Sequence, residues 1–239
     1  SVHVDDRDES RMWIGSERSG LTKFDKKGFY TYAVQDGLPS NSIRDITQSN
    51  DGTLIIACYK AGVAKFDGKK FTLYDDGLDD KRVILLENGF DGEIWAGTES
   101  AGIGVLEQDQ FKMIRDSDGL AHNEMFSLYN DGKRMWAGTF GGGVSCFHDN
   151  TWFTLRESDG LNSNTVGSIV SIDENTTMIG GTSGVSIFKT NNQKFSLEMG
   201  EILTPKEELS FDKQMEPIKG ILKDRFTLTP NPMVYNPSD

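Results

Sequence analysis

Short segments of alternating or apolar residues, separated by turn signals, make up most of the chain. Residues 43–48 have the pattern of a half-buried strand. Asp51-Gly52 comes next, and an Asp-Gly pair supplies the positive φ that a two-residue hairpin needs. Residues 54–58, 63–66 and 70–74 are three further short segments rich in apolar residues. This stretch therefore predicts a meander of four strands, and no part of it has a helical period.

The same unit recurs along the chain in one register. Three independent markers keep a spacing of 40 to 42 residues. The triplet Asp-Gly-Leu begins at Asp36, Asp76, Asp118 and Asp159. A hydrophobic residue before a pair of small residues falls at Trp13, Ile55, Trp95, Trp136 and Met178. A glycine followed by an aliphatic residue falls at Gly20, Gly62, Gly102, Gly143 and Gly184. A repeated four-stranded meander of this length is typical of a β-propeller blade.

The repeat predicts an all-β fold, a β-propeller of four-stranded blades with a period of about 41 residues and five legible blades. The propeller is expected over residues 1–199, with repeats at approximately 1–41, 42–81, 82–123, 124–164 and 165–199. From Gly200 the pattern fails, and residues 200–239 are expected to form a tail: a degenerate blade, a closing strand or a lid. Within it, Thr204 and Pro205 have the sequence of a helix start. Small residues that would let adjacent blades pack closely follow the large hydrophobic positions: Gly15, Ala57, Gly97, Gly138 and Gly180.

Closure of the propeller is a separate question. The sequence starts at what would be the innermost strand of the first blade, so an exchange of strands between the two ends is not evident unless residues 200–239 provide it. An open edge would expose the hydrogen-bonding groups of a strand, which proteins tend to cover. We therefore expect that the tail packs on the gap or that two chains pair there as a homodimer.

Charge and cysteine content narrow the range of partners. The net charge is −12, from 25 basic and 37 acidic residues, which argues against nucleic acid or an anionic membrane surface as a partner. No apolar run of about 18 residues predicts a membrane span, and no N-terminal segment has the pattern of a signal peptide. Cys58 and Cys146 lie about two repeats apart, so we expect two free thiols on strands.

Several stretches resemble the two-component regulator propeller repeat over about 199 of the 239 residues. They are Trp13-Ile14-Gly15-Ser16-Glu17, Asp36-Gly37-Leu38-Pro39-Ser40-Asn41-Ser42, Trp95-Ala96-Gly97-Thr98, Trp136-Ala137-Gly138-Thr139 and Asp159-Gly160-Leu161-Asn162-Ser163-Asn164. In that family such blades form the sensor region of bacterial histidine-kinase and hybrid two-component sensors, outside the cytoplasm, and are linked to detection of carbohydrates and other cues. The resemblance implies a periplasmic or extracellular sensor. Members of the family usually carry seven or more blades, so five legible blades suggest a sensor fragment, a truncated relative or a stand-alone propeller.

The candidate binding surface is one rim of the propeller. In a meander blade, the turn between the second and third strands lies on the same face as the link to the next blade, and propellers bind ligands on such faces. Residues that the repeat explains are set aside, and the variable ones are the candidates. On the turns these are Glu17, Arg18, Tyr59, Lys60, Glu99 and Phe140; on the links they are Lys81, Arg82, His122 and Glu124. The ligand-binding prediction is Glu17, Arg18, Tyr59, Lys60, Glu99, His122 and Phe140, a mixture of charge and aromatic rings that suits a polar organic ligand such as a sugar.

Motifs for metals, phosphate or catalysis are weak. Asp116-Ser117-Asp118-Gly119 starts like a calcium loop, but Ser127 stands where the distal glutamate is needed. Gly141-Gly142-Gly143 lies in a hairpin turn and not before a helix, so it is not a phosphate loop. The three histidines have no metal spacing. We predict no cofactor, no metal and no catalytic residue.

The function expected is therefore non-enzymatic recognition of an extracellular cue, such as a carbohydrate, on the rim. A platform for protein–protein interaction is the alternative. A carbohydrate-active enzyme is a third reading, because Glu17, Glu99 and Glu124 are rim carboxylates that the repeat does not explain.

Overall fold

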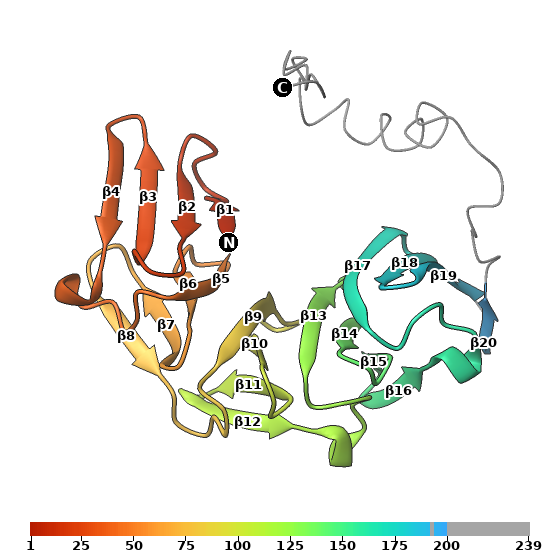
Figure 1. Cartoon of the computed structure of the whole chain (residues 1–239). Coiled ribbons are helices and arrows are strands. Elements are labelled where there is room, and N and C mark those ends of the chain that lie inside the picture. Colours follow the sequence, from red (N-terminus) through yellow and green to blue (C-terminus); the bar gives the residue numbers. More distant parts are fainter. Residues whose placement is uncertain (192–193, 200–239) are drawn as a thin grey trace, which may run out of the picture. The chain divides into compact units, whose positions relative to one another are not determined.

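The computed structural model describes residues 1–191 and 194–199 (Figure 1). They form five four-stranded antiparallel sheets, each built from four consecutive strands. The predicted all-β propeller of four-stranded blades is confirmed. The expectations for residues 200–239, including the helix start at Thr204 and the closing strand or lid, lie outside the described residues.

The strands run in chain order within each sheet. The first sheet contains β1 (Val2–Val4), β2 (Met12–Gly15), β3 (Leu21–Asp25) and β4 (Gly28–Tyr32). The second contains β5 (Ile43–Gln48), β6 (Leu54–Cys58), β7 (Gly62–Phe66) and β8 (Phe71–Tyr74). The third contains β9 (Val83–Asn88), β10 (Ile94–Thr98), β11 (Ile103–Glu107) and β12 (Gln110–Ile114). The fourth contains β13 (Met125–Asn130), β14 (Met135–Thr139), β15 (Val144–His148) and β16 (Thr151–Leu155). The fifth contains β17 (Val166–Asp173), β18 (Thr176–Gly181), β19 (Gly184–Asn191) and β20 (Lys194–Met199).

Consecutive sheets are joined by links that contain a short turn. Three of these links form 3-10 turns: η1 (Val34–Asp36), η2 (Asp116–Asp118) and η3 (Glu157–Asp159). In η2 the Asp118 carboxylate accepts the backbone N–H of Arg115 at 2.9 Å, and the Asn123 side chain accepts that of Asp116 at 2.9 Å. Leu120, the third residue of the triplet, is buried. The Asp-Gly-Leu repeat is therefore a structural link, and Asp118 is already used in it.

Hydrophobic cores lie between consecutive sheets. The repeated aromatic position packs onto the next sheet: Trp13 lies 5.9 Å from Phe66 of the second sheet, and Trp136 lies 5.1 Å from Phe188 of the fifth. Both tryptophans are buried. Figure 1 shows the innermost strands β5, β9, β13 and β17 following one another along the inner side of the array. The packing of each sheet on its neighbour is what places residues from different blades side by side.

Small residues after the aromatic positions allow this close packing. A Cβ atom added to Gly138 would lie 2.5 Å from the carbonyl oxygen of Val166 in the fifth sheet. One added to Gly15 would lie 2.5 Å from a side-chain carbon of Ile43 in the second sheet. Real Cβ atoms do not come so close, so larger residues at these positions would push the sheets apart.

An acidic residue in the turn before β2, β10 or β14 accepts the indole N–H of that strand's tryptophan. Asp5 accepts it from Trp13 at 3.3 Å, Glu93 from Trp95 at 3.0 Å and Asp131 from Trp136 at 3.0 Å. A buried indole N–H needs such a partner. These three acid–tryptophan pairs were not foreseen from the sequence.

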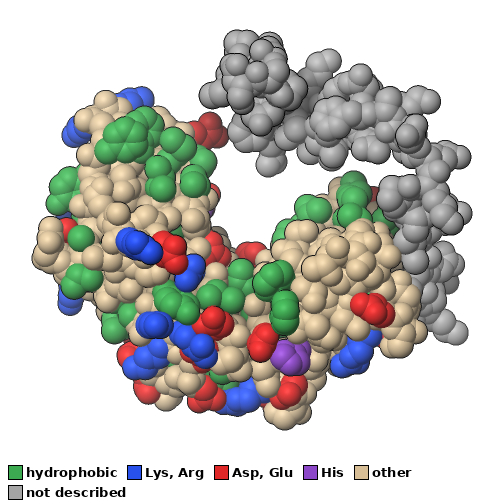
Figure 2. Space-filling model, in the orientation of Figure 1, with side chains coloured by type: hydrophobic (Ala, Val, Ile, Leu, Met, Phe, Trp, Pro, Cys, Tyr) green, Lys and Arg blue, Asp and Glu red, His purple; other side chains and the backbone are tan. Residues whose placement is uncertain are grey.

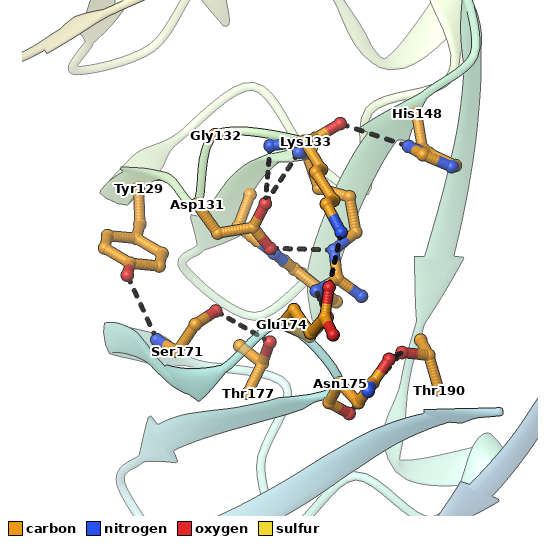
Figure 3. Close-up of polar contacts among 12 residues, drawn as sticks. Tyr129, Asp131, Gly132, Lys133, His148, Ser171, Glu174, Asn175, Thr177 and Thr190 are labelled. Atoms are coloured by element: carbon orange, nitrogen blue, oxygen red, sulfur yellow. Dashed lines mark hydrogen bonds and ion pairs between the residues drawn. The ribbon is translucent and has the colours of Figure 1, made fainter. Parts of the chain in front are cut away.

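The pair in the fourth sheet extends into the fifth (Figure 3). Arg134 donates from Nε to Asp131 at 2.7 Å and from a terminal nitrogen to the carbonyl oxygen of Glu174 at 3.1 Å. Lys133 forms an ion pair with the Glu174 carboxylate at 2.8 Å. Burial raises the pKa of Asp131, but hydrogen bonds from Trp136 and the neighbouring backbone outweigh it and hold the pKa below its ordinary value. The cluster ties the two sheets together at the rim away from the turns between second and third strands.

The two end sheets each leave an apolar face exposed. On the first sheet, Val2 and Phe29 are 65% and 73% exposed. On the fifth sheet, Val170 and Ile172 are 51% and 55% exposed. Figure 2 shows hydrophobic side chains on the first sheet and, at the other end of the array, beside β17. Within residues 1–190, no hydrogen bond or ion pair joins the first sheet to the fifth. The expectation that the tail or a second chain packs between the first and fifth sheets stays a prediction.

Candidate functional site

One backbone contact fixes the same turn position in successive blades. The residue after the second strand donates its N–H to a carbonyl oxygen in the link that enters its own blade. Tyr59 donates to Ser42 at 2.9 Å, Glu99 to Arg82 at 3.0 Å, and Phe140 to Glu124 at 3.0 Å. Turns and links therefore lie together on one rim, and three of the predicted site residues occupy equivalent places on it.

A cavity of about 410 Å³ opens among the second, third and fourth blades, and we call it the rim pocket. Its lining residues are Arg44, Tyr59, Ile84, Glu99, Glu124, Met125, Phe126 and Phe140. Each of the three blades contributes its turn residue and at least one residue from its innermost strand. The rim pocket thus brings together Tyr59, Glu99 and Phe140 from the predicted set, with Glu124 from the fourth blade's entry link.

One wall of the rim pocket is a polar network. The Tyr59 hydroxyl donates to Oε2 of Glu99 at 2.9 Å, and Arg82 forms an ion pair with the same oxygen at 3.0 Å. The bond to Glu99 raises the pKa of the Tyr59 hydroxyl above its ordinary value, because ionisation would break it. The guanidinium of Arg44 lies 4.5 Å from the Tyr59 ring centroid, close enough for a cation–π contact. Glu17 pairs with Arg44 at 3.6 Å.

The opposite wall is aromatic. The rings of Phe126 and Phe140 lie 5.9 Å apart at 60°, an edge-to-face arrangement. Both are largely exposed, at 47% and 55%. A Cβ atom added to Gly167 in the fifth blade would lie 3.4 Å from the Phe126 ring, so the ring rests over a position without a side chain. Two exposed rings in contact form a ready surface for a flat or apolar ligand group.

The other predicted residues do not line the rim pocket. Arg18 is exposed on the first blade. His122 is exposed, and its Nδ1 accepts the backbone N–H of Glu124 at 3.1 Å. Lys81 pairs with Asp75 at 2.6 Å. Lys60 is exposed beside Tyr59, with its ammonium 5.6 Å from that ring. The basic candidates therefore lie around the rim pocket and not in it.

Three lining residues missed by sequence reasoning occupy one repeat position. Arg44, Ile84 and Phe126 are the second residues of the innermost strands β5, β9 and β13. The equivalent residue of β17 is Gly167. Alignment of the repeats shows Arg, Ile, Phe and Gly at this position, so the variation was visible. These residues lie on strands and not on turns or links, so their variation alone does not show that they face a pocket.

Lys60 has a strained backbone that provides a direct test of the turn. Its φ is +66°, a region that L-residues other than glycine rarely adopt, and the equivalent Gly141 has φ +83°. Lys60→Gly is expected to raise the free energy of unfolding by about 0.5–1 kcal/mol, because glycine removes the strain but loses more chain entropy. Urea denaturation measures the change. Ser100→Gly at the third-blade equivalent is the control and should destabilise, since Ser100 donates to Asp80 at 2.9 Å.

Metal ligands, reactive thiols and paired carboxylates are the groups among the described residues that could support chemistry other than binding. No group of three or more His, Cys, Asp or Glu in residues 1–191 and 194–199 is placed to hold a metal ion. Cys58 and Cys146 are free and buried, as predicted for strand-borne thiols, and burial raises the pKa of Cys58 to about 12. Such thiols are unreactive at neutral pH. Glu99 and Glu124 are the two carboxylates that share the rim pocket.

Similar proteins were found only among solved structures. No family model and no curated protein matches the chain. The extracellular domain assigned to a hybrid two-component system of B. thetaiotaomicron is 21% identical, with a TM-score of 0.66 over 82% of this chain and 29% of that one. A second extracellular domain from that organism, assigned to a one-component system, is 16% identical, with a TM-score of 0.67 over 85% and 31%. Virginiamycin B lyase from Staphylococcus aureus is 14% identical, with a TM-score of 0.62 over 85% and 70%.

These likenesses show the propeller fold, which occurs both in extracellular domains assigned to one- and two-component systems and in a lyase. The chain spans less than a third of the length of the two extracellular domains, at 29% and 31%. None of the helical segments in the part of the chain that the structure describes could cross a bilayer.

Proposed function

We propose that residues 1–199 form a non-enzymatic recognition propeller of a bacterial sensor protein, outside the cytoplasm, that binds its ligand in the rim pocket. The observation that carries this proposal is the origin of the pocket walls. Tyr59, Glu99 and Phe140 occupy one turn position in three consecutive blades, and their backbones make the same contact. The fold fixes the position and leaves the side chain variable. Similarity to extracellular domains assigned to one- and two-component systems supports the sensor role.

The lining of the rim pocket favours a small polar ligand with an apolar face. Binding sites of this kind combine aromatic surface with a few placed polar groups. Phe126 and Phe140 supply the aromatic surface, and Tyr59, Glu99 and Arg44 supply hydrogen-bonding groups. An oligosaccharide has both kinds of surface, since its ring hydrogens form an apolar face and its hydroxyls hydrogen-bond. A carbohydrate is therefore the first ligand class to test.

Phe140→Ala is expected to weaken ligand binding at least about fivefold, because truncation of a central aromatic contact that anchors a ligand costs more than about 1 kcal/mol. A glycan array and thermal-shift screen on the full chain would identify the ligand, and titration calorimetry would give the change in Kd. Phe29→Ala is the matched control, since Phe29 is also exposed but lies on the first sheet. Equal affinity of the two variants would argue against the rim pocket as the binding site.

Protein docking is the second candidate, and the exposed Phe126–Phe140 pair is the observation that favours it. Exposed aromatic clusters are common at protein interfaces. Capture of a defined protein partner that Phe140→Ala abolishes, together with no hit on the glycan array, would replace the small-ligand proposal by this one. Hydrolysis of an oligosaccharide that is lost in both Glu99→Gln and Glu124→Gln would instead favour the enzyme reading.

A further inference from the structure

The carboxylate of Glu124 differs from the other charged groups of the rim pocket. Its backbone is fixed on both sides: the N–H donates to His122 at 3.1 Å, and the carbonyl oxygen accepts from Phe140 at 3.0 Å. Among residues 1–190, its side chain makes no hydrogen bond and no ion pair. Glu124 is only partly exposed. A carboxylate on a fixed backbone, in a partly buried residue and without a protein partner, can pair with a cationic group of a ligand.

The remaining charges of the rim pocket are already paired. The Glu99 carboxylate accepts from Tyr59 at 2.9 Å and from Arg82 at 3.0 Å. Arg44, the one cation in the lining, lies 4.5 Å from the Tyr59 ring and pairs with Glu17 at 3.6 Å. The charge left without a partner in the rim pocket is therefore negative. The net charge of −12 adds a long-range attraction for cations and disfavours anions.

The aromatic wall of the rim pocket also favours a cationic ligand. The faces of Phe126 and Phe140 carry negative π density, which attracts cations, and they line the rim pocket together with Glu124. A carboxylate next to exposed aromatic rings is an arrangement suited to an ammonium group, whose N–H groups reach the carboxylate while its attached carbons lie on a ring.

We infer that the rim pocket selects a ligand carrying a primary ammonium group, held by Glu124 and the Phe126–Phe140 pair. An oligosaccharide of amino sugars, or an amine with an apolar body, fits this chemistry. The inference rests on the proposed function of the rim pocket and adds the charge class of the ligand to it.

Two matched probe pairs test the inference on the full chain. The first is deacetylated chitotetraose against N-acetylated chitotetraose, with neutral cellotetraose as a further comparison. The second is 2-phenylethylamine against 2-phenylethanol. Within each pair the ammonium-bearing probe should bind at least tenfold tighter, as measured by titration calorimetry or NMR line broadening. The difference should shrink at about 1 M NaCl, because salt screens a partly exposed ion pair.

Glu124→Gln should bring the affinity ratio within each pair close to one. Glu107→Gln is the control: Glu107 ends β11, the third strand of its blade, and does not line the rim pocket, so the variant should leave the ratio as it is. If cellotetraose binds as tightly as deacetylated chitotetraose and Phe140→Ala weakens both, the ammonium inference is wrong and the proposed function stands. If no charged probe binds better than its neutral partner, the inference is overturned, whatever the glycan array shows.

Discussion

Replacement of Asp131 by alanine is expected to lower the free energy of unfolding by about 3–5 kcal/mol, because it leaves the buried guanidinium of Arg134 without its carboxylate partner. Arg134 is 5% exposed, and its Nε donates to Asp131 at 2.7 Å. The indole N–H of Trp136 loses its acceptor at 3.0 Å in the same step. The variant would therefore leave a guanidinium and an indole N–H buried without their carboxylate, at the junction of the fourth and fifth sheets.

The test is urea denaturation of the wild type and the variant, followed by tryptophan fluorescence. Asp91→Ala is the matched control: Asp91 lies in the equivalent turn of the third sheet, but its side chain is exposed. It should change stability by less than about 0.5 kcal/mol. A loss below about 1 kcal/mol for Asp131→Ala would contradict a structural role for the cluster. Because the pKa of Asp131 is lowered in the folded state, its contribution is present at neutral pH and is lost as the pH falls through that lowered pKa.

Glu87→Gln is expected to stabilise the protein by about 3 kcal/mol at pH 8 and to have little effect at pH 4. Burial on the innermost strand β9 raises the pKa of Glu87 from 4.5 to about 7, and Asp45 adds to the rise. A carboxyl with a raised folded-state pKa is uncharged in both states at pH 4, and it ionises first in the unfolded state as the pH rises. Stability is therefore lost between about pH 4.5 and 7, at about 1.4 kcal/mol for each pH unit.

Glutamine removes this titration and keeps an amide oxygen for the N–H of Asn88, which donates to Glu87 at 3.0 Å. Urea midpoints from pH 4 to pH 8 give the comparison. Glu93→Gln is a control of opposite sign: burial raises the pKa of Glu93, but hydrogen bonds from Trp95 and nearby backbone N–H groups lower it overall. That variant should destabilise at pH 8. An equal effect of Glu87→Gln at both pH values would show that Glu87 ionises normally in the folded protein.

The architecture could be predicted because the residues that pack against neighbouring sheets are of the same type in successive repeats. Trp13 and Trp136 mark where one sheet packs on the next, and Gly138 marks where two backbones nearly touch. The Asp-Gly-Leu triplet marks the link, since Asp118 caps the turn and Leu120 is buried. Each marker has a local physical cause that recurs in other blades, so the sequence alone is enough to find it.

The candidate site could be predicted only in part. Tyr59, Glu99 and Phe140 stand out because the same turn position varies while its surroundings repeat. Arg44 and Phe126 lie on strands. The alternation of apolar and polar residues along a strand does not tell which of its residues line a pocket, because that depends on how neighbouring blades are arranged in space. The partner of Trp136 was hidden for another reason: Asp131 lies in a hairpin turn, where acidic residues are common without any partner.

The backbone contact shared by Tyr59, Glu99 and Phe140 makes the rim a scaffold for directed diversification. Their amide hydrogens bond to the links at 2.9, 3.0 and 3.0 Å, so the turn is fixed through atoms that every amino acid except proline provides. Together with Glu17 and Thr182 at the same position in the first and fifth blades, they define five codons that could be randomised at once. Such a library would vary the binding surface while the acid–tryptophan pairs and the cores between sheets, which hold the blades together, remain unchanged.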